Sequence, residues 1–201
     1  MIVAIVSRLR RGIGNLGERL AGREDSEHVQ AMVRIAFGLV ISAYLYFTVG
    51  ARFNIVVVCI GFEVFASAIF LAIVVYPQRS RLRRGLGTFL DLGTTTYLMW
   101  ANGEVGAPLY FIYLWVTLGN GFGYGVGSLY ASQVMSIVGF ASVVAFNPFW
   151  HHHSLMAGGF LILLAAIPYD GGVLLKRVKA AQDKAELASD AQSSLVSMTS
   201  H

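Results

Sequence analysis

The chain has 201 residues, of which 56% are apolar and only 13% are charged, and its formal net charge is +4. Soluble domains of this length seldom combine so many apolar residues with so few charges, whereas helical membrane proteins usually do. The composition therefore argues against a soluble enzyme. Membrane topology and contact with anionic lipid explain the positive charge without nucleic-acid binding.

Residues 1–31 are predicted to form a juxtamembrane segment. Apolar residues between Ile2 and Leu20 recur at spacings of three and four, with arginines on the other faces. This pattern is typical of an amphipathic helix on the inner leaflet. The glycines of the stretch leave a frayed leader as an alternative. A polar linker follows, in which Asp25 or Ser26 is expected to cap the first membrane helix.

Six apolar runs between residues 32 and 175 approach the length needed to cross a bilayer of about 30 Å as helices. They cover residues 32–50, 55–76, 86–101, 107–122, 129–146 and 155–175. The third and fourth runs are short and contain glycine, so five spans remain an alternative. The predicted fold is all-α, a polytopic membrane bundle of about six transmembrane helices.

Positive charges indicate how this bundle is oriented. Arginines precede or open the first span, four more lie between Arg79 and Arg84, and lysines and arginines follow the sixth span. With six spans all three groups lie on one side, which the positive-inside rule makes cytoplasmic. We therefore expect both termini in the cytoplasm and Arg52 as the remaining cation, on the outer side.

Two carboxylates, Glu63 and Asp91, fall inside predicted spans. Because charge is costly in lipid, both are expected to face the interior of the bundle, paired or protonated. Neither span contains a cation, so threonines of the third and fourth spans and Asn120 are the expected partners. Such a network either holds helices together or senses a ligand or proton, and both interpretations stay open.

Two other stretches invite a functional interpretation. The glycine-rich residues 119–127 lack the Lys-Ser/Thr of a P-loop and are predicted to form a tight turn with close helix contacts. Residues 151–153 are three histidines in a predicted outer loop, where neighbouring side chains diverge and no carboxylate or cysteine completes a metal site. The sequence predicts no metal, no cofactor and no catalytic group within the membrane portion.

Residues 176–201 are predicted to form a signalling and dimerisation helix. Val178, Ala181, Ala185 and Ala188 lie on a narrow seam that is typical of parallel two-helix contacts. A homodimer is the favoured assembly. A monomeric amphipathic tail remains the alternative.

Several separated stretches carry a family resemblance: residues 22–28, 34–35, 108–110, 115–121 and 124–125. Together they resemble the membrane input domain of RpfC-type hybrid sensor histidine kinases, over most of the chain. The resemblance implies a multi-pass receptor of the bacterial inner membrane that detects a diffusible, fatty-acid-type quorum-sensing signal. It also implies a cytoplasmic kinase core and a response regulator or receiver domain as partner.

The same resemblance assigns a role to the last nine residues, 193–201. They are similar to the lead-in of an H-box, in which His201 accepts phosphate, although Met198 and Thr199 stand where Asn and Met are usual. The chain is then expected to be a fragment of a histidine kinase that is not catalytic by itself. ATP and Mg²⁺ would belong to the ATP-binding domain of the full-length kinase.

Ligand contact is implied by the resemblance for the juxtamembrane segment, which the charge pattern puts on the inner side. A fatty acid dissolves in the bilayer, so an inner-leaflet or intramembrane site is physically possible. A small membrane transporter or channel is the alternative function, supported by the intramembrane carboxylates. The resemblance implies ligand contact at Asp25, Ser26 and Glu27. The other candidate ligand-binding residues are Arg52, Glu63, Asp91, Trp115 and Asn120.

Overall fold

The computed structural model describes residues 27–76, 78 and 80–199, with side chains up to residue 189. Within these residues the regular elements are all helices, which confirms the predicted all-α class. In chain order they are α2 (Glu27–Val49), α3 (Phe53–Val75), α4 (Arg81–Gly106), the 3₁₀ turn η1 (Ala107–Leu109), α5 (Tyr110–Tyr124), α6 (Val126–Phe146), α7 (Pro148–His152) and α8 (Ser154–Thr199). The predicted amphipathic segment lies outside the described residues.

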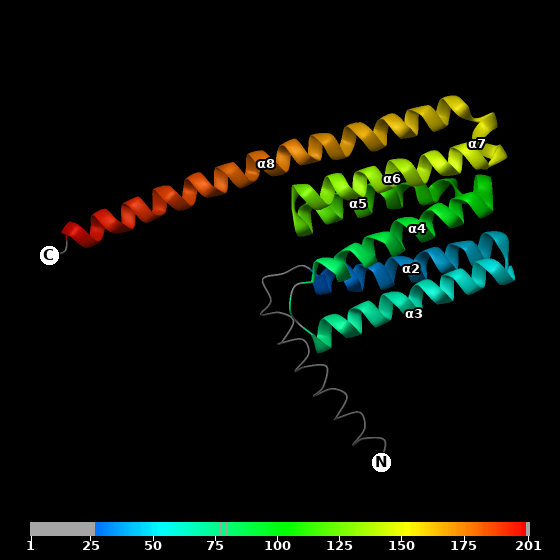
Figure 1. The fold of residues 1–201 in the computed structure, drawn as a ribbon, viewed down its shortest axis with the longest axis horizontal. Coiled ribbons are helices and arrows are strands. Elements are labelled where there is room, and N and C mark those ends of the chain that lie inside the picture. The colour runs from blue at the N-terminus through cyan, green and yellow to red at the C-terminus, as the bar shows by residue number, and fades with distance from the viewer. Residues whose placement is uncertain (1–26, 77, 79, 200–201) are drawn as a thin grey trace, which may run out of the picture.

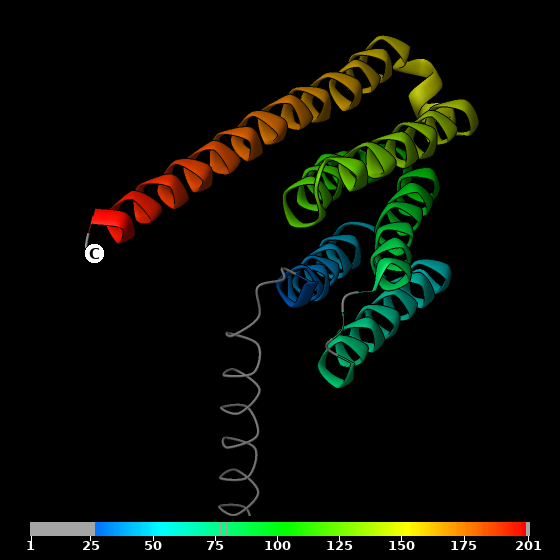
Figure 2. The ribbon, with the colours of Figure 1, turned by 60° about the vertical axis from the view of Figure 1, so that its left-hand side comes forward.

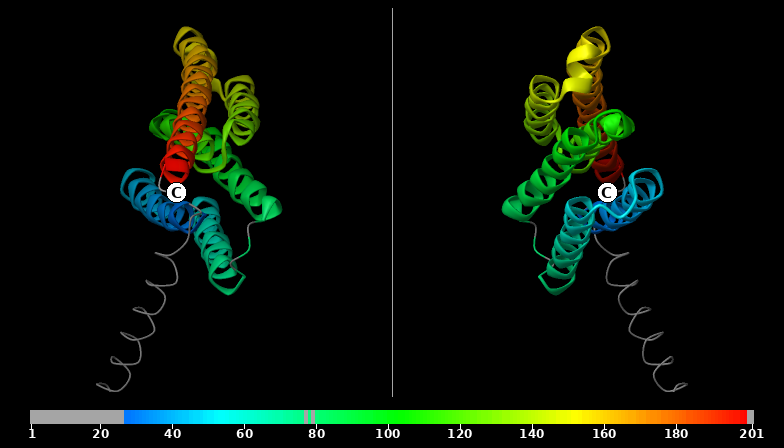
Figure 3. Two further views of the ribbon diagram at one scale, coloured as in Figure 1. Left: turned by 90° about the vertical axis from the view of Figure 1, so that its left-hand side faces the viewer. Right: turned by 90° about the vertical axis from the view of Figure 1, so that its right-hand side faces the viewer.

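The helices form an up-and-down bundle in which α4 joins two groups (Figure 1). On one side α2 packs against α3, and on the other α5, α6 and α8 pack together, while α4 contacts members of both groups. The end views show α4 crossing between them (Figure 3). Short connections explain this order, because neighbouring helices joined by a few residues must run antiparallel.

Four helices are long and apolar enough to cross a membrane: α2, α3, α6 and residues 154–189 of α8. They correspond to the first, second, fifth and sixth predicted spans. The helices that correspond to the third and fourth predicted spans fall short of that description, since α4 has low mean hydropathy and α5 has only 15 residues. Both nevertheless run beside the other helices (Figure 2).

Two glycines with positive φ shape the connections around α5. Gly103, at φ 51°, bends α4 near its end, and Gly125, at φ 93°, is the single residue between α5 and α6. Side chains with a Cβ are disfavoured at such angles, so glycine permits both changes of direction. The predicted tight turn in the glycine-rich stretch is confirmed.

The predicted outer loop before the last helix is instead a short helix, α7. The Asn147 side chain accepts a hydrogen bond from the Phe149 N–H at 2.9 Å and caps it. Trp150 is fully buried, with its ring 5.1 Å from that of Phe140. Two of the three predicted loop histidines lie in α7 and the third caps it, because a buried tryptophan fixes this segment against α6.

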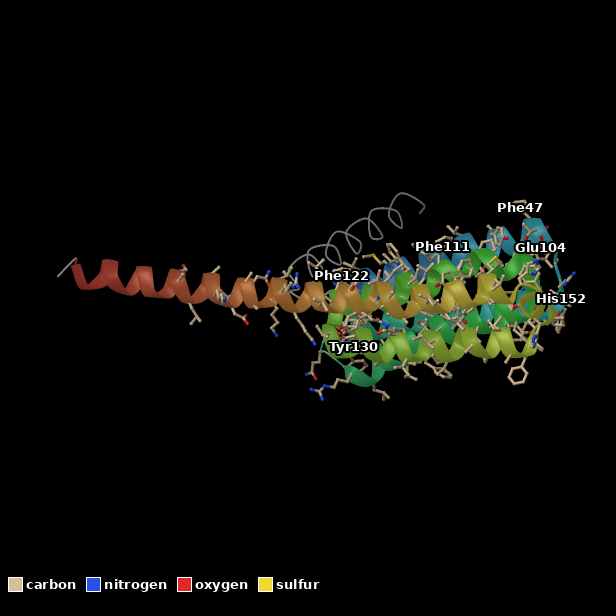
Figure 4. All side chains as sticks on the ribbon, turned by 90° about the horizontal axis from the view of Figure 1, so that it is seen from above. Phe47, Glu104, Phe111, Phe122, Tyr130 and His152 are labelled. Atoms are coloured by element: carbon tan, nitrogen blue, oxygen red, sulfur yellow. The ribbon has the colours of Figure 1, made fainter. Side chains whose placement is uncertain are left out.

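The last helix, α8, continues from Ser154 to Thr199, across the predicted boundary between the last span and the signalling helix at residues 175 and 176. Figure 4 shows α8 leaving the bundle at the end marked by Phe122 and Tyr130, whereas Glu104 and His152 mark the opposite end. Among the described residues, the lysines and arginines other than Arg52 belong to segments at the end from which α8 leaves.

Candidate functional site

A cavity lies between α2, α3, α4 and α5. Its volume is about 90 Å³, and it is open to the outside of the bundle. Four polar side chains gather toward the end from which α8 leaves, and the rest of the lining is mostly apolar but also includes Ser42, Thr94 and Thr95. The polar end consists of Gln30, Arg34, Asp91 and Asn120. The apolar lining includes Val33, Phe37, Ile41, Cys59, Phe62, Leu98, Ile112, Trp115 and Val116.

An ion pair between Arg34 of α2 and Asp91 of α4 dominates the polar end. Arg34 Nε donates to Asp91 Oδ1 at 2.6 Å and Nη2 donates to Oδ2 at 2.9 Å. The two side chains are only 9% and 11% exposed. Bidentate pairs of this kind are the strong ones, and removing either partner would leave the other charge buried and uncompensated. The pair therefore ties α2 to α4.

Gly87 makes this pair possible. It lies one helical turn before Asp91 on α4, and a Cβ built there would come within 2.5 Å of Arg34 Nη2. The guanidinium therefore occupies space that any larger residue would fill. Glycine here provides a close approach between two helices.

Amide side chains close the polar end around the ion pair. Gln30 Nε2 donates to the Gly119 carbonyl at 2.8 Å, which joins α2 to α5. Asn120 Nδ2 donates to Thr88 Oγ1 at 2.9 Å, which joins α5 to α4. Three helices are thus connected by polar contacts at one level of the cavity.

Two aromatic rings stand at the side of the cavity, between α2 and α5. Phe37 and Trp115 stack with their centroids 5.2 Å apart and an interplanar angle of 24°. Both line the cavity, yet they are 41% and 54% exposed on the outside. The aromatic pair therefore lies where the cavity lining reaches the exterior of the bundle.

Glu63 does not join Asp91, and the predicted network of carboxylates, threonines and Asn120 is wrong. The Glu63 side chain packs on Gly38 of α2. It also borders a separate groove on the outer faces of α2 and α3. Glu63 Oε1 is buried without a hydrogen-bond partner among the described residues. Thr95 donates to the Asp91 backbone carbonyl instead of the carboxylate. The network failed because Arg34, on a neighbouring helix, supplies the charge that Asp91 needs.

Glu27 is fully buried and is held by two arginines at the start of α4. It accepts hydrogen bonds from Arg83 and from Arg84 Nε, the latter at 2.5 Å. The Arg84 guanidinium also lies 4.4 Å from the centroid of the Tyr124 ring, a favourable cation–π contact. The beginnings of α2 and α4 and the end of α5 are therefore fastened together below the cavity.

Side chains of α5 and α6 make contacts with α8. The Tyr110 hydroxyl of α5 donates to the Phe160 carbonyl at 2.6 Å. Pro168 lies inside α8 and has no N–H, so the Leu164 carbonyl lacks its usual helical donor. Gln133 Nε2 of α6 donates to that carbonyl at 3.2 Å and to the Ala165 carbonyl at 2.7 Å. A side chain of α6 thus replaces a backbone bond of α8.

The structure brings three of the predicted ligand-binding residues, Asp91, Trp115 and Asn120, into one cavity. Glu27 and Glu63 lie elsewhere, and Arg52 is exposed at the opposite end. Asp25, Ser26 and His201 fall outside the described residues.

The sequence analysis did not identify Gln30, Arg34 or Phe37 as site residues. It counted Arg34 among the cytoplasmic charges. A usable signal was the spacing of Gly87 and Asp91, one turn apart on a helix. A small residue next to a buried charge leaves room for a bulky partner.

Comparison with known proteins supports the predicted resemblance. The chain is 32% identical over 195 residues to the Sensory/regulatory protein RpfC of two strains of Xanthomonas campestris pv. campestris. The alignment covers 92% of this chain and 26% of each relative, so the chain spans about a quarter of their length. No family model and no solved structure matches.

Proposed function

Because this chain belongs, over 92% of its length, with the RpfC-type sensory proteins, we propose that it is the membrane input domain of a two-component sensor histidine kinase. We propose further that it detects a fatty-acid-type diffusible signal, bound in the cavity between α2, α3, α4 and α5. His201 would then belong to the cytoplasmic phosphotransfer region of the full-length kinase, which passes phosphate to a response regulator or receiver domain.

The observation that carries the proposal is the character of the cavity. The cavity is lined mostly by apolar side chains, ends in a buried ion pair and has the Phe37 and Trp115 rings at its side. A fatty acid combines an apolar chain with one polar head, so it fits a site that has both parts in this order. Its access from the bilayer through the aromatic pair requires no aqueous channel.

The proposed topology has six spans in the bacterial inner membrane with both termini cytoplasmic. The gathering of lysines and arginines at the end from which α8 leaves supports it, because such residues are retained on the cytoplasmic side. α4 and α5 count as spans in this proposal since they run within the bundle and their charges are paired or lie near the ends.

The proposed output passes through α8. Ligand in the cavity contacts α5, α5 and α6 pack on α8, and the Gln133 and Tyr110 contacts join them. A shift in this packing would move the helix that continues past the bundle. The Ala-rich seam of that helix supports a homodimer as the unit that carries the change to the kinase core.

The cavity can be tested by filling it. Val116→Trp adds a bulky ring to the lining, whereas Val138→Trp makes the same change on an outer face where the side chain is 63% exposed. Both proteins would be purified in lipid nanodiscs and titrated with radiolabelled fatty acids of differing chain length and unsaturation. We expect the first variant to lose at least about tenfold in affinity, equivalent to about 1.4 kcal/mol, and the second to match the wild type.

Thermal unfolding of both variants provides the control for overpacking, which costs about 1–3 kcal/mol in a tight core. Photo-crosslinking of a diazirine fatty acid to the wild-type protein gives a second measurement. Crosslinks on α2 and α5 are expected. Equal affinity of the two tryptophan variants, together with crosslinks confined to outer faces, would refute the cavity as the site.

A further inference from the structure

We propose that the ligand's carboxylate takes the place of Asp91 at Arg34, so that occupation of the cavity breaks the ion pair between α2 and α4. This inference rests on the proposed function, since it names the head-group contact of the same cavity. It assigns Arg34 as the residue that recognises the acid and Asp91 as its built-in competitor.

The charges around the cavity limit how an acid can bind. Among the described lining residues, Arg34 is the one cation and Asp91 the one anion, and they already satisfy each other. The Gln30 and Asn120 amides donate to Gly119 and Thr88. A carboxylate entering beside an intact pair would add an uncompensated negative charge to a buried site, which is strongly unfavourable. It must therefore find its cation by displacing Asp91.

Geometry favours the exchange. A guanidinium presents parallel N–H donors that match the two oxygens of any carboxylate, so a ligand head can reproduce the contacts of 2.6 and 2.9 Å that Asp91 now makes. The apolar chain adds burial that the short Asp91 side chain lacks. The cavity is continuous with the pair, because both residues line it.

The exchange can proceed without moving net charge into the membrane. A fatty acid in lipid is neutral, because desolvation disfavours its ionised form. Its O–H bond breaks, an O–H bond forms on a carboxylate oxygen of Asp91, and the ligand becomes the anion beside Arg34. Before and after, the site holds one cation and one anion. Asp91, now neutral, no longer ties α4 to α2.

Other titratable groups near this site come from every helix that packs around it. Tyr124 of α5 interacts electrostatically with Asp91 and Arg34, and also with Glu27 and Arg84 beyond them. Glu63 of α3 contacts Gly38 of α2, which lines the cavity, but Glu63 itself is not part of the lining. Asp91 differs from all of these because it contacts Arg34 directly.

A proton balance follows from this exchange. An acid that is ionised in water binds with uptake of one proton, which ends on Asp91. Its apparent affinity should therefore fall about tenfold for each unit of rising pH. Asp91→Asn removes both the competitor and the proton acceptor, so the acid should bind more tightly and with no pH dependence from this source.

The experiment compares a radiolabelled fatty acid with the primary alcohol of the same chain, in nanodiscs at several pH values. Partition into protein-free nanodiscs is subtracted at each pH. Wild-type protein should show the pH-dependent affinity for the acid and a constant affinity for the alcohol. Arg34→Gln combined with Asp91→Asn, a neutral pair that avoids an isolated buried charge, should lose the preference for the acid. Arg83→Gln, which weakens a different ion pair outside the cavity lining, is the matched control and should keep the wild-type pattern.

The outcomes separate this inference from the proposed function. If neither acid nor alcohol binds, the proposed function fails. If both bind with the same affinity at every pH and the neutral pair behaves as wild type, the cavity binds lipid chains but the carboxylate exchange is refuted. Should Asp91→Asn prove unfolded, the behaviour of the neutral pair still decides the question, because its loss of preference for the acid requires that Arg34 binds the carboxylate.

Discussion

Replacing Gln133 by leucine should loosen α8, because it removes both hydrogen bonds from α6 to the carbonyls of Leu164 and Ala165. Side-chain hydrogen bonds between membrane helices contribute about 0.6 kcal/mol on average and up to about 1.7 kcal/mol. The Leu164 carbonyl has no backbone donor at Pro168, so it would be left as a buried, unsatisfied acceptor. Together the two bonds predict a loss of about 1–2 kcal/mol in the free energy of unfolding.

The part due to the proline can be isolated. Pro168→Ala restores an N–H that donates to the Leu164 carbonyl within α8. In that background Gln133→Leu should cost only the bond to Ala165, about half of the original loss. A double-mutant cycle measures this coupling and cancels the packing change caused by removal of the buried proline ring.

Reversible unfolding in mixed lipid–detergent micelles gives the four free energies of the cycle. Ser142→Ala on the same helix is a suitable control, because its hydroxyl donates to the Gly139 carbonyl of α6 itself at 2.6 Å. A cost of Gln133→Leu that is identical in both backgrounds, or no larger than that of Ser142→Ala, would refute the role of Gln133 as the replacement donor.

Three further predictions concern other parts of the chain. Gly87→Ala should destabilise the protein by about 1–3 kcal/mol by displacing the buried ion pair, whereas Gly85→Ala, with open space around it, should be neutral or stabilising by up to about 1 kcal/mol; the free energies of unfolding decide. Single cysteines at Arg23 and Lys184, in a background with the native cysteine removed, should both resist a membrane-impermeant thiol reagent in intact cells, and outside labelling of the first would overturn the six-span topology. His201→Gln in a version that includes the complete kinase core should abolish acid-labile, base-stable phosphate, and persistent label would show that another residue accepts it.

The apolar runs were sufficient to predict most of the bundle. The first, second and fifth predicted spans, 32–50, 55–76 and 129–146, correspond to α2, α3 and α6 with ends that differ by a few residues. Their composition alone makes any other structure unfavourable in lipid, where each backbone polar group must be satisfied within the helix. α4 and α5 were harder to delimit because buried ion pairs and glycines replace part of their apolar surface.

The pairing of side chains could not be obtained in the same way. Arg34 and Asp91 are 57 positions apart, and their contact depends on the rotation and depth of two helices. A count of positive charges treats Arg34 as one more cytoplasmic cation, although it is a buried partner with 9% of its side chain exposed. Gln133 and Pro168 pose the same difficulty. The proline shows in the sequence that the Leu164 carbonyl lacks a backbone donor, but the sequence does not show that Gln133 supplies one.

Because α8 is continuous, a rotation of the helix within the bundle would be carried along its whole length. Each residue of an α-helix turns the chain by about 100° and advances it about 1.5 Å, so Thr199 lies about 46 Å along the axis from Pro168 if the helix is straight. Without a break to absorb rotation, the azimuth of α8 within the bundle would fix the azimuth of the kinase core that the proposed function places after it. One residue inserted after Lys176 would turn the part of the helix beyond it by about 100°. We expect such a rotation to invert the response to ligand rather than weaken it. Seven inserted residues lengthen the helix but restore its phase to within about 20°.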